Sequence, residues 1–257
     1  MRTISAGMGF GLAIVNGKLT GYGIAVPEFK CDTVAAGAVG VAADTTNGTV
    51  KAFTRRPSPQ LQAMVAKFHE VVASMELYTI SDIAVSDRAV GIIGMGRYGY
   101  RLAVVGYTGL PHQSNVSDIE VAVGDESFVP TAGSSGWLLA VKSPRHWQVT
   151  NAVPDLTITN KWLYSATGWK APFSHYTPDA ELEWLESEYY GDCVAAYADY
   201  VATINGGAVY PSQNLGNQYQ VRYIPTWHGW AEVVFGHQCG MGRAIDGQVY
   251  FWGTQPQ

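Results

Sequence analysis

The sequence has few ionised side chains. Asp, Glu, Lys and Arg make up 14% of its 257 residues, whereas globular proteins contain about 25%. A free-standing soluble protein normally carries more surface charge than this. We therefore expect much of the surface to be covered by other subunits. An extracellular protein with a polar but uncharged surface is the second interpretation of the same composition.

Basic clusters and long apolar runs are also lacking. The net charge is −5, and Arg55-Arg56 is the one adjacent pair of basic residues. Phosphate neutralisation needs clustered Lys and Arg, so we expect no direct nucleic-acid binding. No apolar run approaches the roughly 18 residues of a membrane span. The glycine-broken N-terminus does not have the form of a signal peptide, so we expect neither membrane insertion nor export by the usual route.

Cysteine is scarce, and the three residues Cys31, Cys193 and Cys239 are far apart. Such spacing does not indicate a disulfide framework. The segment 227–239 contains His228, His237 and Cys239, but a structural zinc site would need a second pair of ligands. A cysteine nucleophile with a histidine base stays open as a third functional hypothesis. The leading expectation is a protein with no metal, no cofactor and no enzymatic activity.

One stretch, GMGRYG at 94–99, has the Gly-x-Gly-x-x-Gly spacing of a dinucleotide-binding loop. That loop requires a helix to begin at its third glycine. The residues that follow here, YRLAVVGYTGLP, are a short β-type run broken by glycine and proline. We therefore interpret the motif as a turn. GMG also occurs at 7–9 and 240–242, and we expect one turn device used three times.

Short β-type runs separated by glycine turns dominate the chain, with Asn16-Gly17 and Asn47-Gly48 as hairpin signals. A first amphipathic helix is expected over about 59–76, with Ser58 as N-cap and Pro59 at its first position. Its apolar residues fall on one face at helical spacing: Leu61, Met64, Val65, Phe68, Val71, Val72 and Met75.

A second helix is expected over about 178–204, because Thr177-Pro178-Asp179 resembles a capped start rich in acidic residues. The predicted fold is α+β and mainly β, with antiparallel sandwich or barrel-like sheets and the two helices on their faces or edges. We expect one compact domain over 1–257; a lobe boundary near 143–155 is the alternative.

All eight tryptophans lie between 137 and 252. Trp184 would project opposite the apolar stripe of the second expected helix, and an exposed tryptophan is typical of an interface anchor. Trp169, Trp227 and Trp230 are further candidates for contact with a partner or ligand. The acidic side chains of 179–192 invite a comparison with paired glycosidase carboxylates, but a solvated helix face explains them better.

These observations favour a non-enzymatic, self-assembling structural protein, with a virion subunit of the capsid or tail as the leading hypothesis. It would be assembled in the host cytoplasm, and its partners would be copies of itself and other structural subunits. The alternative is a glycan- or receptor-binding module that uses the aromatic residues of the C-terminal half. The third hypothesis is a cysteine-dependent hydrolase.

Overall fold

The computed structural model describes most of the first 106 residues and a smaller part of the remainder. The described residues are 2–86, 88–97, 99–106, 117–122, 126–130, 138–142, 156–158, 162–165, 167–172, 185–197, 200–211 and 229–253. They are mainly β, as the sequence predicts, and they include one helix. The alternative lobe boundary near 143–155 lies outside them.

The described strands form seven antiparallel sheets, each made of strands that follow one another in the sequence. Sheet 1 holds β1 (Ile4–Ala6), β2 (Gly11–Val15) and β3 (Lys18–Tyr22), and sheet 2 holds β4 (Thr33–Ala36), β5 (Gly40–Asp44) and β6 (Thr49–Phe53). Sheet 3 holds β7 (Thr79–Val85), β8 (Ala89–Gly96), β9 (Gly99–Gly106) and β10 (Ser117–Ala122), and sheet 4 holds β11 (Glu126–Pro130) and β12 (Leu138–Lys142). Sheet 5 holds β13 (Leu156–Ile158), β14 (Trp162–Ser165), β15 (Thr167–Pro172) and β16 (Leu185–Tyr190). Sheet 6 holds β17 (Cys193–Tyr197), β18 (Tyr200–Asn205) and β19 (Ala208–Pro211), and sheet 7 holds β20 (Trp230–Gly236), β21 (Cys239–Ala244) and β22 (Val249–Gly253).

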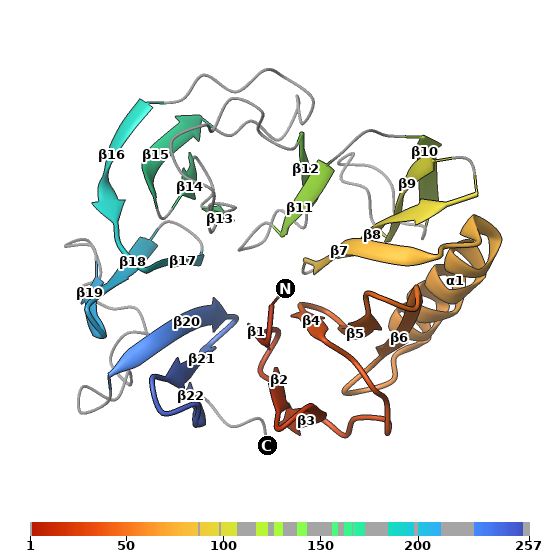
Figure 1. Cartoon of the computed structure of the whole chain (residues 1–257). Coiled ribbons are helices and arrows are strands. Elements are labelled where there is room, and N and C mark those ends of the chain that lie inside the picture. Colours follow the sequence, from red (N-terminus) through yellow and green to blue (C-terminus); the bar gives the residue numbers. More distant parts are fainter. Residues whose placement is uncertain are drawn as a thin grey trace.

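The sheets stand side by side around a common axis (Figure 1). The first strand of each sheet packs beside the first strand of the next, from β1 through β4, β7, β11, β13 and β17 to β20, and β20 returns to β1. This closed ring corrects the predicted sandwich or barrel. Each sheet is too narrow to wrap into a barrel, and it buries its two faces against two different neighbours instead of one opposing layer.

The predicted hairpin turns are confirmed at both Asn-Gly pairs. Asn16 and Gly17 have φ angles of 51° and 72° between β2 and β3, as the mirror-image hairpin turn requires. Gly48 has a φ of 64° between β5 and β6. The Asp44 carboxylate accepts hydrogen bonds from the Asn47 backbone N–H at 3.2 Å and from its side-chain amide at 2.7 Å, which fixes the second turn.

The first predicted helix is confirmed as α1 (Pro59–Met75). The Ser58 hydroxyl accepts a hydrogen bond from the Leu61 N–H at 3.2 Å, so it caps the first turn as expected. The helix buries Met64, Phe68, Val71 and Met75, and the flanking apolar residues of the predicted face pack against the same core. It lies on the outer side of the ring against β6, β8, β9 and β10.

The second predicted helix is wrong. The described part of 178–204 forms β16, β17 and β18, and 178–184 lie outside the described residues. Tyr, Val, Thr and Ile are frequent here, and they favour strands. Gly191 lies between β16 and β17, and a Cβ added to Gly191 would lie 2.2 Å from the Ile204 carbonyl oxygen. Of the acidic residues in this segment, Glu186 and Glu188 lie on the exposed strand β16, whereas Asp179, Glu181 and Glu183 lie outside the described residues.

Three backbone hydrogen bonds of 3.0 Å join the loops that follow the first strands of neighbouring sheets. The His237 N–H donates to the Gly7 carbonyl, Met8 N–H to Gly37, and Ala38 N–H to Ser86. A glycine precedes each donor. A Cβ added at Gly236, Gly7 or Gly37 would lie 2.3, 2.7 or 2.4 Å from the acceptor oxygen in the next sheet. These glycines therefore allow the close approach that joins sheets 7, 1, 2 and 3.

The three GMG segments do not form the same kind of turn, so the expectation of one turn used three times is wrong. Residues 7–9 form such a loop, whereas 94–96 end β8 and 240–242 lie inside β21. The GMGRYG stretch makes the hairpin between β8 and β9, in which Gly96 pairs with Gly99. The turn interpretation of that stretch is therefore confirmed, and strand β9 occupies the place where a dinucleotide loop needs a helix.

Candidate functional site

The four tryptophan candidates do not form one surface. Trp230 is only 2% exposed; its ring lies edge-to-face against Tyr250 and tilted against Trp252, each with centroids 5.7 Å apart. A ring so covered offers no face to a sugar or partner, which corrects its assignment. Trp169 is half-buried in β15. Trp184 and Trp227 lie outside the described residues.

The three cysteines are buried, and none of them forms a disulfide bond. The Cys239 thiol donates to the Gly7 carbonyl at 3.3 Å, and the Cys193 thiol donates to the Val233 carbonyl at 3.7 Å. Burial raises the pKa of Cys239 from 9.0 to about 11. Burial, with nearby Asp32 and Asp44, raises the pKa of Cys31 to about 11. Protonated, covered thiols are the opposite of what a cysteine nucleophile needs.

His237 and Cys239 are sequence candidates for a metal site or for a nucleophile and its base. The two residues flank a turn at Gln238, whose φ is 56°, and do not share one face of a strand. His228 lies outside the described residues. Among the residues that are described, no group of three His, Cys, Asp or Glu is placed to hold a metal ion.

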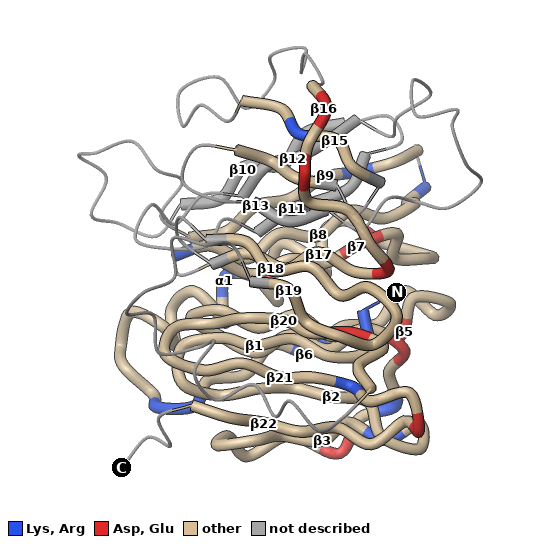
Figure 2. Tube along the Cα trace, turned by 90° about the vertical axis from the view of Figure 1, so that its left-hand side faces the viewer, with Lys and Arg blue, Asp and Glu red and all other residues tan. Residues whose placement is uncertain are grey.

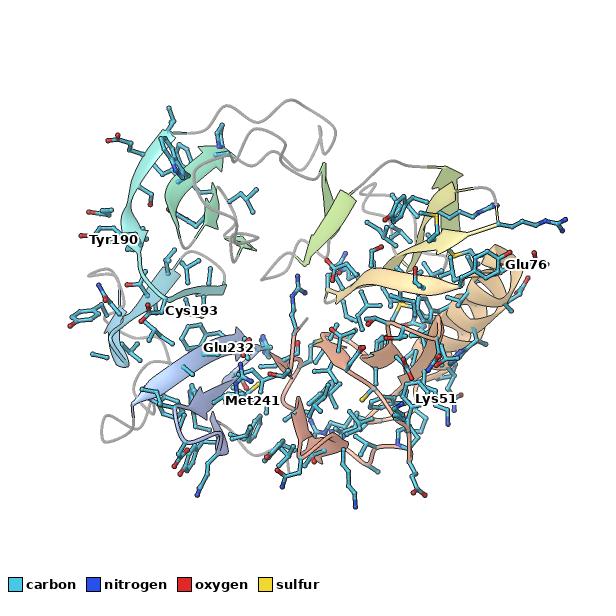
Figure 3. All side chains as sticks on the ribbon, viewed as in Figure 1. Lys51, Glu76, Tyr190, Cys193, Glu232 and Met241 are labelled. Atoms are coloured by element: carbon cyan, nitrogen blue, oxygen red, sulfur yellow. The ribbon has the colours of Figure 1, made fainter. Side chains whose placement is uncertain are left out.

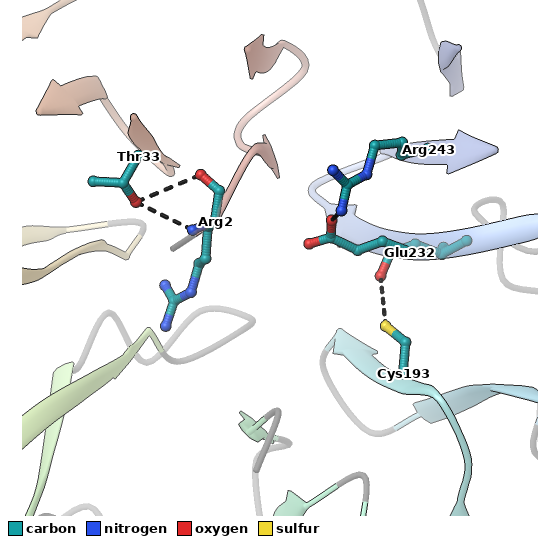
Figure 4. A network of polar contacts seen from close by, with 6 residues as sticks. Arg2, Thr33, Cys193, Glu232 and Arg243 are labelled. Carbon is teal, nitrogen blue, oxygen red and sulfur yellow. Dashed lines mark hydrogen bonds and ion pairs between the residues drawn. The ribbon is translucent and has the colours of Figure 1, made fainter. Parts of the chain in front are cut away.

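Polar contacts link the strands nearest the axis on both sides of β1 (Figure 4). The Thr33 hydroxyl at the start of β4 accepts from the Arg2 N–H at 3.2 Å. In sheet 7, an Arg243 guanidinium N–H donates to the Glu232 carboxylate at 3.1 Å, and the pair is partly buried. The first contact holds sheet 1 to sheet 2, and the second ties β20 to β21 within sheet 7, so both are structural contacts of neighbouring strands.

Of the six large apolar side chains that are exposed among the described residues, four belong to sheets 5 to 7, and the other two are Met8 and Tyr78. Tyr190 on β16, Tyr210 on β19 and Ile245 in the β21–β22 turn are 62%, 57% and 71% exposed, and Leu185 on β16 is 43% exposed. We call these four residues the rim patch. Figure 3 shows Tyr190 on the outer edge of the ring.

Turns from three sheets join the parts of the rim patch. Beside Tyr190, Asp192 donates its N–H to the Ile204 carbonyl at 2.8 Å and accepts from the Gly206 N–H at 2.9 Å on its carboxylate. On the other side of that hairpin, the Gly207 carbonyl accepts from the Trp230 N–H at 3.0 Å. Ile245 donates its N–H to the Gly229 carbonyl at 2.9 Å. The patch therefore rests on a hydrogen-bonded framework and not on separate loops.

Acidic residues surround the rim patch. Glu186, Glu188, Asp192 and Asp246 are exposed, and Figure 2 shows this side of the ring with acidic residues on β16. Among the described residues of 185–253, the one Lys or Arg is Arg243, which pairs with Glu232. Glu186 and Glu188 lie between Leu185 and Tyr190 on β16, and the half-buried Lys170 of β15 pairs with Leu185. The charge at the rim patch is therefore mainly negative.

Comparison with known proteins identifies the architecture. No protein-family model matches the chain, and no curated protein matches it in sequence. The C-terminal domain of gp131 from bacteriophage phiKZ is similar in structure, with a TM-score of 0.53 and 10% identity over 98% of this chain and 91% of that one. The CRINKLY WD40 ectodomain of the Arabidopsis thaliana receptor kinase ACR4 has a TM-score of 0.54 and 10% identity over 98% of both chains. The fold is a β-propeller.

In this propeller each sheet is a blade, and the rim patch covers the outer strands of blades 5 to 7. Sequence reasoning did not find Tyr190 because it placed this residue in the expected second helix. It did not find Tyr210 because the exposure of a strand residue depends on whether its strand is the outermost one of the blade. The β16 segment LESEYY does carry a signal, since Glu186, Glu188 and Tyr190 alternate with less exposed neighbours.

Within the described residues, no helix is long and apolar enough to cross a membrane.

Proposed function

We propose that this chain is a non-enzymatic structural protein of a virion, which assembles with copies of itself and with other structural subunits. The observation that carries the proposal is the rim patch, where four large apolar side chains from three adjacent blades are exposed. Large exposed apolar patches mark interaction sites on soluble proteins.

The composition of the patch fits a protein interface. Tyrosine and large aliphatic residues are typical of interface cores, where they supply most of the binding energy. The low proportion of charged residues in the whole chain, 14%, lowers the free-energy cost of covering its surface, because ionised groups cost the most to remove from water.

The virion part of the proposal has one source of support. A phage protein domain, that of gp131, has the same fold over almost the whole chain. At 10% identity this likeness concerns the fold alone, so the virion role is our inference from it together with the surface.

Sedimentation velocity tests the assembly. We expect the unaltered chain to form larger species as its concentration rises from micromolar towards millimolar. Replacing both Tyr190 and Tyr210 by threonine, which keeps the strand propensity, should weaken association by roughly 2–4 kcal/mol in binding free energy. Met8→Thr is the control, because Met8 is also an exposed apolar residue, at 43%, but lies outside the patch. A chain that stays monomeric throughout, or variants equal to the control, would contradict the proposal.

A glycan or a receptor is the second candidate partner, favoured by the same exposed tyrosine rings. Aromatic side chains provide flat apolar faces with a polar edge, which suits stacking against a sugar. Glycan-array binding that disappears in the Tyr190→Thr and Tyr210→Thr variants would favour this function. Binding that survives in both would exclude the patch as a sugar site.

A further inference from the structure

The charges of the chain are divided unequally around the ring. Residues 1–106 contain ten Lys and Arg against seven Asp and Glu, a net charge of +3. Residues 107–257 contain six against fourteen, a net charge of −8. In the propeller the first segment supplies blades 1 and 2, α1 and most of blade 3, and the second supplies the rest of the ring. Among the described residues alone, the first segment has ten Lys and Arg against six Asp and Glu, and the second has three against eight. The described part of the ring therefore has a basic side and an acidic side.

The exposed charges follow the same division. Among the described residues up to 106, six exposed cations stand against three exposed acids. Lys51 on β6 and the nearby Lys30 belong to this basic side, and the Lys51 ammonium lies 5.2 Å from the ring centroid of Phe29, the neighbour of Lys30 in the chain. In the described part of blades 5 to 7 around the rim patch, in contrast, the exposed charges are acidic.

The two sides face away from each other. β6 and α1 lie across the ring from β16 and β19 (Figure 1), and Figure 3 shows Lys51 and Tyr190 on opposite sides. The rim patch of one molecule therefore cannot reach the basic side of the same molecule. If two rim patches met each other in a two-fold dimer, they would bring like charges together, which is unfavourable.

We propose that the rim patch of one chain docks against the basic side of a second copy, around Lys30 and Lys51, in a head-to-tail contact. This inference rests on the proposed self-assembly and names its geometry. The apolar centre supplies the buried area, while the opposite charges select the partner surface and speed encounter. A head-to-tail contact leaves one free surface at each end, so it repeats into a closed ring or an open filament.

Charge reversal tests the contact. Glu186→Lys with Glu188→Lys places cations around the rim patch, and Lys30→Glu with Lys51→Glu places anions on the basic side. Each double variant alone should associate roughly a hundredfold or more weakly, because like charges then face each other. An equimolar mixture should associate again, since reversed surfaces meet reversed surfaces and native surfaces meet native ones.

Glu28→Lys with Glu70→Lys is the matched control. Both residues are exposed on the basic side, so this variant changes the net charge as much as the rim variant while leaving the two surfaces attractive. It should associate at least as well as the unaltered chain.

Sedimentation velocity at an ionic strength of about 0.01 M, where the screening length is ~30 Å, separates the outcomes. Recovery in the mixture alone supports the head-to-tail contact. If the unaltered chain assembles but reversal or mixing has no effect, this inference fails and the proposed self-assembly stands. If the unaltered chain is monomeric at every concentration, both fail.

Discussion

Replacing Gly236 by alanine should loosen the joint where blade 7 meets blade 1. The new Cβ would lie 2.3 Å from the Gly7 carbonyl oxygen and within 2.9 Å of two further backbone atoms of Ala6. Backbone atoms cannot rotate away as a side chain can, so the two blades must separate by about 1 Å to restore van der Waals contact. The same carbonyl accepts from the His237 N–H at 3.0 Å and from the Cys239 thiol at 3.3 Å.

The cost has two parts. Overpacking in a closely packed interior costs about 1–3 kcal/mol, and a buried hydrogen bond left unmade costs about 1–3 kcal/mol. We therefore expect the free energy of unfolding to fall by roughly 2–6 kcal/mol. Guanidinium unfolding followed by tryptophan fluorescence suits this measurement, because Trp230 and Trp252 lie in the core of blade 7.

Gly229→Ala is the matched control. Its Cβ would meet only the end of the Ile245 side chain, at 3.0 Å, and that side chain is exposed and can rotate. We expect a change within about 1 kcal/mol. If Gly236→Ala is no more destabilising than this control, the close approach of blades 7 and 1 does not contribute to the free energy of unfolding as we describe.

Four further outcomes follow from the described contacts. Phe68→Ala should lower the free energy of unfolding by about 3–5 kcal/mol, because Phe68 is fully buried between α1 and the blades. Unfolding in guanidinium measures this loss, and Lys67→Ala on the same helix is the control. Ser58→Ala should cost about 0.5–2 kcal/mol through loss of the cap, and an unchanged melt would show that the cap is not needed. The three thiols should resist iodoacetamide in the native state and react after unfolding, as intact-mass measurement would record; fast native labelling would contradict their burial. Because the folded-state pKa of Cys31 and Cys239 is raised from 9.0 to about 11, their contribution to stability is complete below about pH 9 and is lost as pH rises through about 11; Cys31→Ala with Cys239→Ala should flatten that part of the pH profile.

Local structure was predictable from the sequence where one signal dominated. The serine cap, the proline and the apolar face all indicate α1, and the Asn-Gly pairs indicate their hairpins. The helix predicted over 178–204 shows the limit of the same reasoning. An acid-rich start after Thr177-Pro178 is typical of a helix, but the β-favouring residues after Gly191 and the packing between blades decide the conformation.

The ring itself could not be read from the sequence. Blades of two to four strands joined by segments of unequal length leave no regular repeat, and a short amphipathic strand looks the same in a sandwich, a barrel or a propeller. The glycines that join neighbouring blades stand out only once Gly236, Gly7 and Gly37 are seen against the carbonyls of the next blade.

One feature of the candidate site, its charge, could be predicted from the sequence. The division of charge between 1–106 and 107–257 can be counted directly. It gains meaning only when the ring places the two segments on opposite sides. Tryptophan was a misleading guide, because Trp230 fills the core of blade 7 while the smaller Tyr190 and Tyr210 are exposed.

Negative-stain electron microscopy of the unaltered chain, at low ionic strength and high concentration, tests the central claim that propellers bury their outer rims against copies of themselves. We predict rows or closed rings of particles in contact through their outer edges, which separate into single propellers when the salt is raised to about 1 M and the screening length falls to ~3 Å. Fields of separate particles under both conditions would contradict the account.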